Sequence, residues 1–216
     1  MIRQFGTIDL LFLLAAVRWT VLLTLAAFVG GSIIGLMIAV MRVSSFWISR
    51  ALAVIYTQLI QGTPLLVILF ILFFGLPIFG FSVQPWIAAT AAFSVYAGAF
   101  LGEIWRGALQ AIPKTQWEAG SSLGLGFFEQ LRYVIIPQAI RVAIPPTVGF
   151  LVQLIKNTSL AATIGFVELT REGQLTTAST FQPFTVYIIV ALFYFLMCFP
   201  LTQWSRALER KLHVAG

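Results

Sequence analysis

Long apolar stretches separated by short polar segments dominate this chain. Three runs contain no Asp, Glu, Lys or Arg, namely Trp19–Met41, Ala51–Gly102 and Gly173–Ser205. A further apolar stretch, interrupted by prolines and by Arg141, follows Tyr133. Because a helix needs about 20 apolar residues to cross a bilayer, the longest run can hold two spans and each of the others one. The pattern predicts an all-α membrane protein, a single transmembrane domain over residues 1–216, with five transmembrane helices at roughly 20–42, 52–78, 86–107, 134–155 and 182–204.

Composition supports a lipid environment. Hydrophobic residues make up 60% of the chain, charged residues 9%, and the mean hydropathy is +0.98. Soluble domains are about one quarter charged. The net charge of +6 would suit nucleic acid, but the positions of the basic residues suit a membrane orientation better, and we expect no nucleic acid partner.

Cytoplasmic loops of membrane proteins are enriched in Lys and Arg. With the N-terminus outside and the C-terminus in the cytoplasm, the predicted spans place eight basic residues in cytoplasmic segments and four outside or near that side. The cytoplasmic set is Arg42, Arg50, Arg106, Lys114, Arg132, Arg206, Arg210 and Lys211, and the other set is Arg3, Arg18, Lys156 and Arg171. This distribution predicts the stated orientation.

The residues before Trp19 are apolar but carry Asp9 and Arg18. The uncharged run between these two charges is short, and no clear small-x-small cleavage site follows it. We therefore predict a short interfacial segment in front of the first span rather than a cleaved leader.

Glycines and prolines indicate where the spans pack and break. Two GxxxG pairs, Gly31 with Gly35 and Gly98 with Gly102, would allow helices to approach closely. In the second span, Gly62 and Pro64 interrupt the helix beside polar Gln58, Gln61 and Thr63, and in the fourth span Pro137, Pro145 and Pro146 are expected to do the same. Lipid cannot satisfy the backbone groups that a break releases, so a break must face protein, water or a ligand, as in many transporters.

Lys156 stands near the end of the fourth predicted span. If that span is one straight helix from Tyr133, Lys156 lies about 35 Å along it, at the outer interface. If the double proline bends or restarts the helix, Lys156 stays deeper, where an ionisable group is costly and usually functional. The residues alone leave both placements open. At the end of the third span, Glu103 and Arg106 have the spacing of an ion pair.

A polar, glycine-rich island, KTQWEAGSSLGLG, covers Lys114–Gly126 between the third and fourth spans. Pro113 suits a first helical turn, Thr115 and Glu118 have capping-box spacing, and Gly124 suits a helix end. A second short amphipathic piece, Phe127–Tyr133, follows. The island therefore predicts two small helices hinged at glycine, which either dock a partner or rest on lipid headgroups.

The island also resembles a family signature. Membrane subunits of binding-protein-dependent ABC importers carry a cytoplasmic motif of Glu-Ala-Ala, three residues, Gly, nine residues, Ile, one residue and Leu-Pro. Here EAGSSLGLGFFEQLRYVIIP resembles it, with Gly120, Val134 and Ile136 as small departures. Further segments, QGTPLLV, GEIWRGALQAIPKTQW, IIPQAIRVAIPP and KNTSLAATIG, look like the polar amino acid permeases of the histidine, glutamine, arginine and opine group.

The resemblance implies a permease subunit that forms the solute pathway of an ATP-driven amino acid importer in the bacterial inner (cytoplasmic) membrane. The island, about 110–133, would be a cytoplasmic coupling helix between helices 3 and 4 that contacts an ATPase. The implied coupling residues are Trp117, Glu118, Ala119, Gly120, Leu123 and Gly124. The chain has no Gly-Lys dipeptide and so no phosphate loop, which makes it a transport subunit and not an enzyme.

The implied partners are an ABC ATPase subunit dimer that binds the ATP and Mg, a second permease subunit (an identical copy or a paralogue) and a periplasmic solute-binding protein. No cofactor is expected in this chain. The substrate would be an amino acid, with polar uncharged or acidic kinds ahead of basic ones, because Asn157 stands where related permeases often have Asp. The implied substrate-binding residues are Thr63, Pro64, Tyr96, Lys156, Asn157, Thr158, Ser159 and Glu168.

Two other classes of function remain open at this point. An ion-coupled secondary amino acid carrier would use an ionisable pair such as Lys156 and Glu168, but no inverted hydropathy repeat supports it. A membrane scaffold without transport activity would use the island for docking and would not need broken helices.

Overall fold

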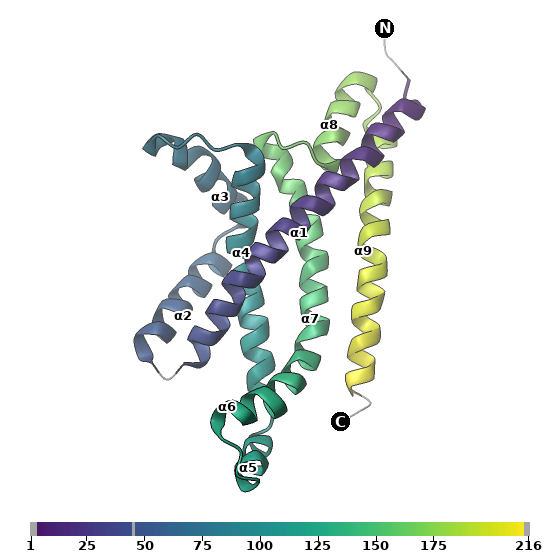
Figure 1. Cartoon of the computed structure of the whole chain (residues 1–216). Coiled ribbons are helices and arrows are strands. Elements are labelled where there is room, and N and C mark those ends of the chain that lie inside the picture. The colour runs from purple at the N-terminus through teal and green to yellow at the C-terminus, as the bar shows by residue number, and fades with distance from the viewer. Residues whose placement is uncertain (1–3, 45, 214–216) are drawn as a thin grey trace.

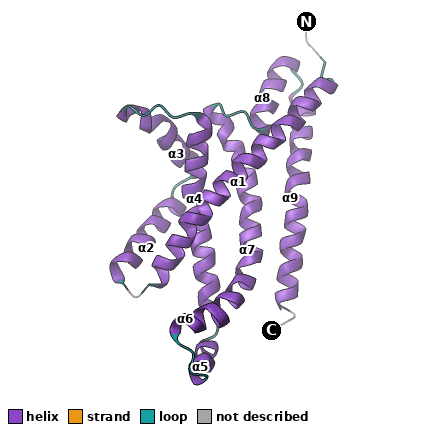
Figure 2. Ribbon diagram, in the orientation of Figure 1, coloured by secondary structure: helices purple, strands orange, loops and turns teal. Residues whose placement is uncertain are grey.

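The computed structural model describes residues 4–44 and 46–213, and every regular element in that part of the chain is helical (Figure 2). Four helices there are long and apolar enough to cross a membrane, or five if one sharply bent pair counts as a single span. The prediction of an all-α membrane protein is confirmed. The helices that qualify are Thr7–Val43, Pro85–Gln110, Phe127–Ile164 and Pro183–Lys211, and the bent pair is Trp47–Gly62 with Leu65–Phe79.

The first helix, α1, runs without interruption from Thr7 to Val43. Residues 7–19, predicted as a short interfacial segment in front of the first span, belong to the same helix as the span, and their position at the membrane interface stays a prediction. Nothing between Thr7 and Trp19 breaks a helix, and Asp9 stabilises its start by accepting a hydrogen bond from the Gly6 amide (2.9 Å). At 37 residues, α1 is about 55 Å long, longer than a bilayer core is thick, and it crosses the bundle obliquely (Figure 1).

The helix α4 (Pro85–Gln110) packs against α1 along a seam of small residues. A Cβ placed on Gly31 would lie 2.4 Å from the Cβ of Ala97, and a Cβ on Gly98 would lie 2.5 Å from Ile34 Cγ2. Gly35 and Gly102 face each other's helices in the same way. Both predicted GxxxG pairs thus pack against each other, and their missing side chains allow the two backbones to approach.

The second apolar segment is split. Helix α2 (Trp47–Gly62) ends just before Thr63, and α3 (Leu65–Phe70) begins just after Pro64. The two arms of this segment meet at a bend of 102°. This confirms the interruption predicted at Gly62 and Pro64. The second arm continues through η1 (Ile71–Gly75), a π-helical turn, and η2 (Leu76–Phe79).

The fourth span is straighter than predicted. Helix α7 (Ile136–Asn157) continues through Pro145 and Pro146, so the interruption expected there is wrong. A π-helical turn, η3 (Leu131–Ile135), instead precedes Pro137, just as η1 precedes Pro77. A wider turn makes room for a proline ring that would otherwise clash with the carbonyl four residues earlier. The backbone thus adjusts around the prolines without ending the helix.

The remaining elements close the two ends of the bundle. After α7 the chain forms η4 (Thr158–Ile164) and α8 (Leu169–Thr180), and α9 (Pro183–His213) returns beside α7. The short helices α5 (Lys114–Ser122) and α6 (Phe127–Gln130) lie at the opposite end from α8 (Figure 1). Rings of Trp19, Trp86 and Phe166 pack together near the start of α4, with centroids 5.4 to 6.3 Å apart.

The α1–α4 seam generates the first prediction. We expect Gly31→Ala to destabilise the protein by about 1–3 kcal/mol, because the added methyl group overlaps Ala97 and the neighbouring α4 backbone. Gly107→Ala on α4 is the matched control, since nothing lies within 4 Å of its added Cβ. Thermal unfolding in detergent measures both variants. Equal unfolding temperatures for the two would show that the seam does not carry the α1–α4 contact.

Candidate functional site

The break between α2 and α3 presents polar backbone groups at the surface of this subunit, since Gln61, Gly62 and Pro64 are exposed. Thr63 Oγ1 donates to the Leu59 carbonyl (2.7 Å), and the Thr63 amide donates to the Ile60 carbonyl (3.4 Å). In the described part of the chain, the carbonyls of Gln61 and Gly62 receive no backbone amide, because Pro64 has no N–H and α3 starts in a new direction. These carbonyls are available as acceptors.

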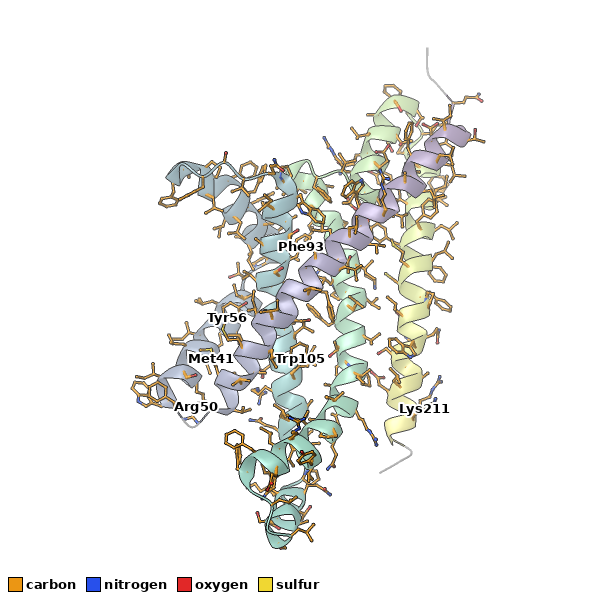
Figure 3. All side chains as sticks on the ribbon, in the orientation of Figure 1. Met41, Arg50, Tyr56, Phe93, Trp105 and Lys211 are labelled. Atoms are coloured by element: carbon orange, nitrogen blue, oxygen red, sulfur yellow. The ribbon has the colours of Figure 1, made fainter. Side chains whose placement is uncertain are left out.

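Helix α4 holds the break in place. Tyr56 Oη donates to the Val95 carbonyl (2.6 Å), and Gln61 Nε2 donates to the Ala99 carbonyl (3.3 Å). On the other arm, Leu69 is fully buried in a core cluster that includes Phe93 of α4 (Figure 3 labels Tyr56 and Phe93). Both arms of the bent segment are therefore attached to the same helix.

A second polar position lies where α4 meets the end of α7. The side chain of Tyr96 interacts with that of Asn157, and the Tyr96 ring packs against Phe100, with centroids 4.6 Å apart. Phe100 stacks on Phe150 of α7, 5.5 Å between centroids. Two of the predicted substrate residues, Tyr96 and Asn157, are thus brought together beside a wall of aromatic rings.

Lys156, Thr158 and Ser159 lie close together where α7 ends and η4 begins, but their side chains have different surroundings. Because α7 is unbroken, Lys156 stands near its C-terminal end, as expected for the straight-helix alternative, and its side chain is exposed beside α9. Thr158 is fully buried, and its hydroxyl donates to the Ile155 carbonyl (2.7 Å). Ser159 donates to the Lys156 carbonyl (2.7 Å).

Glu168 is fully buried and caps α8. Its two carboxylate oxygens accept hydrogen bonds from the amides of Thr170 and Arg171 (2.9 Å each), and Tyr194 Oη of α9 donates to Oε2 (2.9 Å). Burial raises the pKa of this carboxyl, while the two backbone amides partly oppose the shift. The predicted contact between Glu168 and a substrate stays a prediction, and in this conformation the carboxylate is engaged within the protein.

The polar island, Lys114–Gly126, folds into α5 and the turn that follows it, and α6 begins directly after the island. Helix α5 ends in a Schellman motif, in which the Leu125 amide donates to the Gly120 carbonyl and the Gly124 amide to the Ser121 carbonyl. Gly124 has a φ of +75°, which a residue with a side chain adopts only under strain, so the predicted helix end at Gly124 is confirmed.

The predicted capping box of Thr115 and Glu118 is wrong, because α5 already starts at Lys114 after Pro113 and has no side-chain cap. The carboxylate that caps a helix in this hairpin belongs to Glu129, which accepts a hydrogen bond from the Gly126 amide (2.8 Å) at the start of α6. The spacing of Thr115 and Glu118 fits a box with Thr115 as N-cap, but the helix starts at Lys114 after Pro113, two residues too early for it.

Gln130 links the two short helices, and the sequence pattern did not single it out. Its buried side chain donates to the Leu125 carbonyl (2.7 Å) and to Ser121 Oγ (3.0 Å). A Cβ on Gly120 would lie 2.9 Å from Gln130 Cγ. The Gln130 side chain therefore occupies the space that a methyl group at position 120 would need. This explains why Gly120 stands where the signature has alanine.

The outer surface of the hairpin is apolar. Leu123 is 79% exposed and Phe128 is 80% exposed, while Trp117 stacks on Phe127 with centroids 5.7 Å apart. On the same side of the bundle, Glu103 forms ion pairs with Arg106 and with Arg42 of α1 (3.3 Å for Arg42). The predicted pair of Glu103 and Arg106 is confirmed, and Arg42 extends it to a second helix.

The predicted substrate residues fall into three places: the α2–α3 break with Thr63 and Pro64, the α4–α7 contact with Tyr96 and Asn157, and the interior behind α7 with Thr158 and Glu168. Helix α3 and η4 both pack against α4, which places the first two around the same helix. Among the described residues, no group of three or more His, Cys, Asp or Glu side chains could hold a metal ion. The arrangement supplies polar groups for binding rather than for covalent chemistry.

Comparison with known proteins gives consistent matches along the chain. Residues 31–214 match the family described as binding-protein-dependent transport system inner membrane component. The L-cystine transport system permease protein TcyB of Bacillus subtilis (strain 168) is 40% identical over 197 residues, which cover 91% of this chain and 84% of the relative. The probable amino-acid ABC transporter permease protein YckA of the same organism is 38% identical over 200 residues, which cover 93% of this chain and 88% of the relative.

A solved structure has the same fold. The crystal structure of an amino acid ABC transporter with histidines contains a chain that matches with a TM-score of 0.89 and 32% sequence identity. The match covers 97% of this chain and all (100%) of the other.

The Glu168 cap generates the second prediction. We expect Glu168→Ala to lower the unfolding free energy by about 1–2 kcal/mol, because the α8 amides lose their acceptors. Glu168→Gln should cost less, since one amide oxygen remains as an acceptor. Thermal unfolding in detergent compares the two, and an Ala variant as stable as the Gln variant would contradict the capping role.

The same carboxyl predicts a pH dependence. Because its pKa is raised in the folded state, the folded protein holds this proton at pH values where the unfolded chain has released it. Its contribution to stability is fully present below the usual carboxylic pKa and is lost as pH rises through the raised value. The unfolding temperature of the wild type, relative to Glu168→Gln, should therefore fall as pH rises through this window. A pH-independent difference would contradict the burial of an ionisable carboxyl.

Proposed function

The chain belongs to the family of inner membrane components of binding-protein-dependent transport systems, and from this premise we propose that it is the permease subunit of an ATP-driven amino acid importer. It is a multi-pass protein of the inner membrane. The relatives are named as amino-acid and L-cystine permeases, and the solved neighbour is an amino acid ABC transporter. These names give no support to an ion-coupled secondary carrier.

The observation that carries the proposal is the α5–α6 hairpin. The stretch that resembles the family signature, from Glu118 to Pro137, runs from α5 through the turn at Gly124 into α6 and the start of α7, at one end of the bundle with apolar side chains exposed (Figure 1). An exposed apolar surface on a polar, rigidly capped hairpin suits a protein partner. We assign that partner as the ATPase, which would bind the ATP and Mg that this chain has no phosphate loop to hold.

The orientation follows from the same assignment. The hairpin would lie in the cytoplasm with the C-terminus, and α8 would lie outside with the N-terminus. The distribution of Lys and Arg supports this orientation. Since Trp117, Glu118, Ala119, Leu123 and Gly124 stand on the hairpin surface or at its turn, they would contact the ATPase. Gly120 would instead keep α5 close to Gln130.

The substrate would bind around α4. The free carbonyls of Gln61 and Gly62, beside Thr63 and Pro64, suit the α-ammonium group of an amino acid. The polar edge of Tyr96 and Asn157, with Lys156 and Ser159 on the same turn of chain, would contact the rest of the solute, including its carboxylate. Thr158 and Glu168 would act behind this surface, where they connect the end of α7 to α8 and α9 through Tyr194.

Two further partners complete the proposed importer. A second permease subunit, either another copy of this chain or a paralogue, would close the pathway, because the helices of one subunit form only one wall. A periplasmic solute-binding protein would deliver the amino acid to the α8 side. No cofactor is assigned to this chain.

Reconstituted transport tests the proposed function. In liposomes that contain the permease with the ATPase and binding protein encoded beside it, we expect amino acid uptake that requires ATP on the ATPase side. Uptake is measured by mass spectrometry of the vesicle lumen after exposure to an equimolar mixture of amino acids. Uptake driven by a proton or sodium gradient without ATP would contradict the proposal.

A surface substitution tests the docking assignment. Leu123→Glu should reduce the amount of ATPase that co-purifies with the permease by about tenfold or more, because a charge replaces an exposed apolar contact. Leu175→Glu on α8 is the matched control, since Leu175 is also exposed (44%) but lies at the opposite end of the bundle. Retention of the ATPase by the Leu123 variant would show that it docks elsewhere.

A further inference from the structure

A groove with a mixed polar and apolar lining runs between α7 and α9 and has a volume of about 310 Å³. Gly149, Gln153 and Lys156 line it from α7, and Ser205, Arg206 and Glu209 line it from α9. In each set the spacing is that of one helix face. The two helices run in opposite directions (Figure 1), so Lys156 lies toward the α8 end of the groove and Glu209 toward the α5 end.

Lipid chains cannot form hydrogen bonds with the polar side chains that line this groove. Lys156, Arg206 and Glu209 are ionisable, exposed and, among the described residues, engaged in no ion pair. Lys156 stands at the end of α7, and Arg206 and Glu209 stand in the last two turns of α9, so these charges can reach water beyond the lipid. The uncharged polar side chains of Gln153, Thr202 and Ser205 line the groove between these charges, away from the helix ends, where water or a solute suits them better than lipid.

The width of the groove depends on a glycine. Gly149 has no side chain, and a Cβ built on it would meet only Ser205 Oγ, at 4.0 Å. The groove floor there is the contact of the two helices, where Ser205 Oγ donates to the Pro145 carbonyl (2.9 Å). A larger side chain at position 149 would therefore enter the groove without first displacing the backbone.

The groove is connected to the proposed substrate site. Gln153 Nε2 donates to Asn157 Oδ1 (3.1 Å), and Asn157 interacts with Tyr96 on α4. Polar side chains thus continue from the α4–α7 contact into the groove and along it to Arg206 and Glu209. Two cations and one anion leave the groove lining with one net positive charge.

We propose that the α7–α9 groove is the section of the solute path between the proposed binding site and the cytoplasmic end of α9, and that its positive charge selects amino acids with uncharged or acidic side chains over basic ones. The inference rests on the proposed function, because the groove is open along one side and the second permease subunit would have to close it. Lys156 and Arg206 attract the carboxylates of the passing solute, and Gly149 provides the room.

Uptake by variants in the reconstituted importer tests the groove. Gly149→Leu should reduce ATP-driven uptake of all amino acids more than tenfold, and Gly149→Ala should reduce it less. Gly107→Leu is the matched control, because it adds the same side chain on α4 where a new Cβ meets nothing within 4 Å. Unfolding temperature and co-purified ATPase are measured for each variant, so that a folding defect is separated from a blocked path.

A charge reversal provides an independent readout. Arg206→Glu should shift the uptake ratio of arginine to glutamate toward arginine on the order of fivefold, with the unfolding temperature unchanged. Three results together would overturn the groove inference alone. The wild type takes up amino acids, the folded Gly149→Leu variant takes them up equally well, and Arg206→Glu leaves the uptake ratio of arginine to glutamate unchanged. The absence of ATP-driven uptake of any amino acid by the wild type would instead overturn the proposed function, and the groove inference with it.

Discussion

The close approach of α1 and α4 is the contact on which the rest of the structure depends. Between apolar helices in lipid there is little hydrophobic driving force, so association relies on packing, and glycines at positions 31, 35, 98 and 102 let these two backbones approach. Helix α4 then holds both arms of the broken second segment and the aromatic wall of α7. The binding residues proposed above are arranged around this one helix.

The second constraint is that an interrupted backbone needs partners that lipid cannot supply, from protein, water or a ligand. At Gly62–Pro64 the chain turns by 102° and exposes carbonyls beside α4, whereas before Pro77 and Pro137 it widens into a π-helical turn and continues. Prolines inside the apolar segments therefore differ in their effect. Pro64 stands at a break between two helices, whereas Pro77 and Pro137 each follow a π-helical turn in a helix that continues.

Features that depend on a few neighbouring residues could be predicted from the sequence. The break at Pro64, the helix end at Gly124 and the seam glycines each follow from a local steric rule. The burial of Glu168 could not be predicted, because its cap is completed by Tyr194, 26 residues away on α9. The start of α1 at Thr7 was missed although its signals are local, since no helix breaker precedes Trp19 and Asp9 accepts from the Gly6 amide. The partners of Gln130, Ser121 and Leu125, are close in the chain but come into reach only after α5 and α6 fold against each other.

In the proposed orientation α5 and α8 lie on opposite sides of the inner membrane, and thiol labelling tests this most directly. Cys198 is the sole cysteine, so Leu123→Cys and Leu175→Cys can each be introduced into a Cys198→Ala chain. A membrane-impermeant maleimide applied to intact spheroplasts should label position 175 at once and position 123 only after the membrane is disrupted. Labelling of position 123 in intact spheroplasts would place the hairpin outside, away from any ATPase, and would contradict the account.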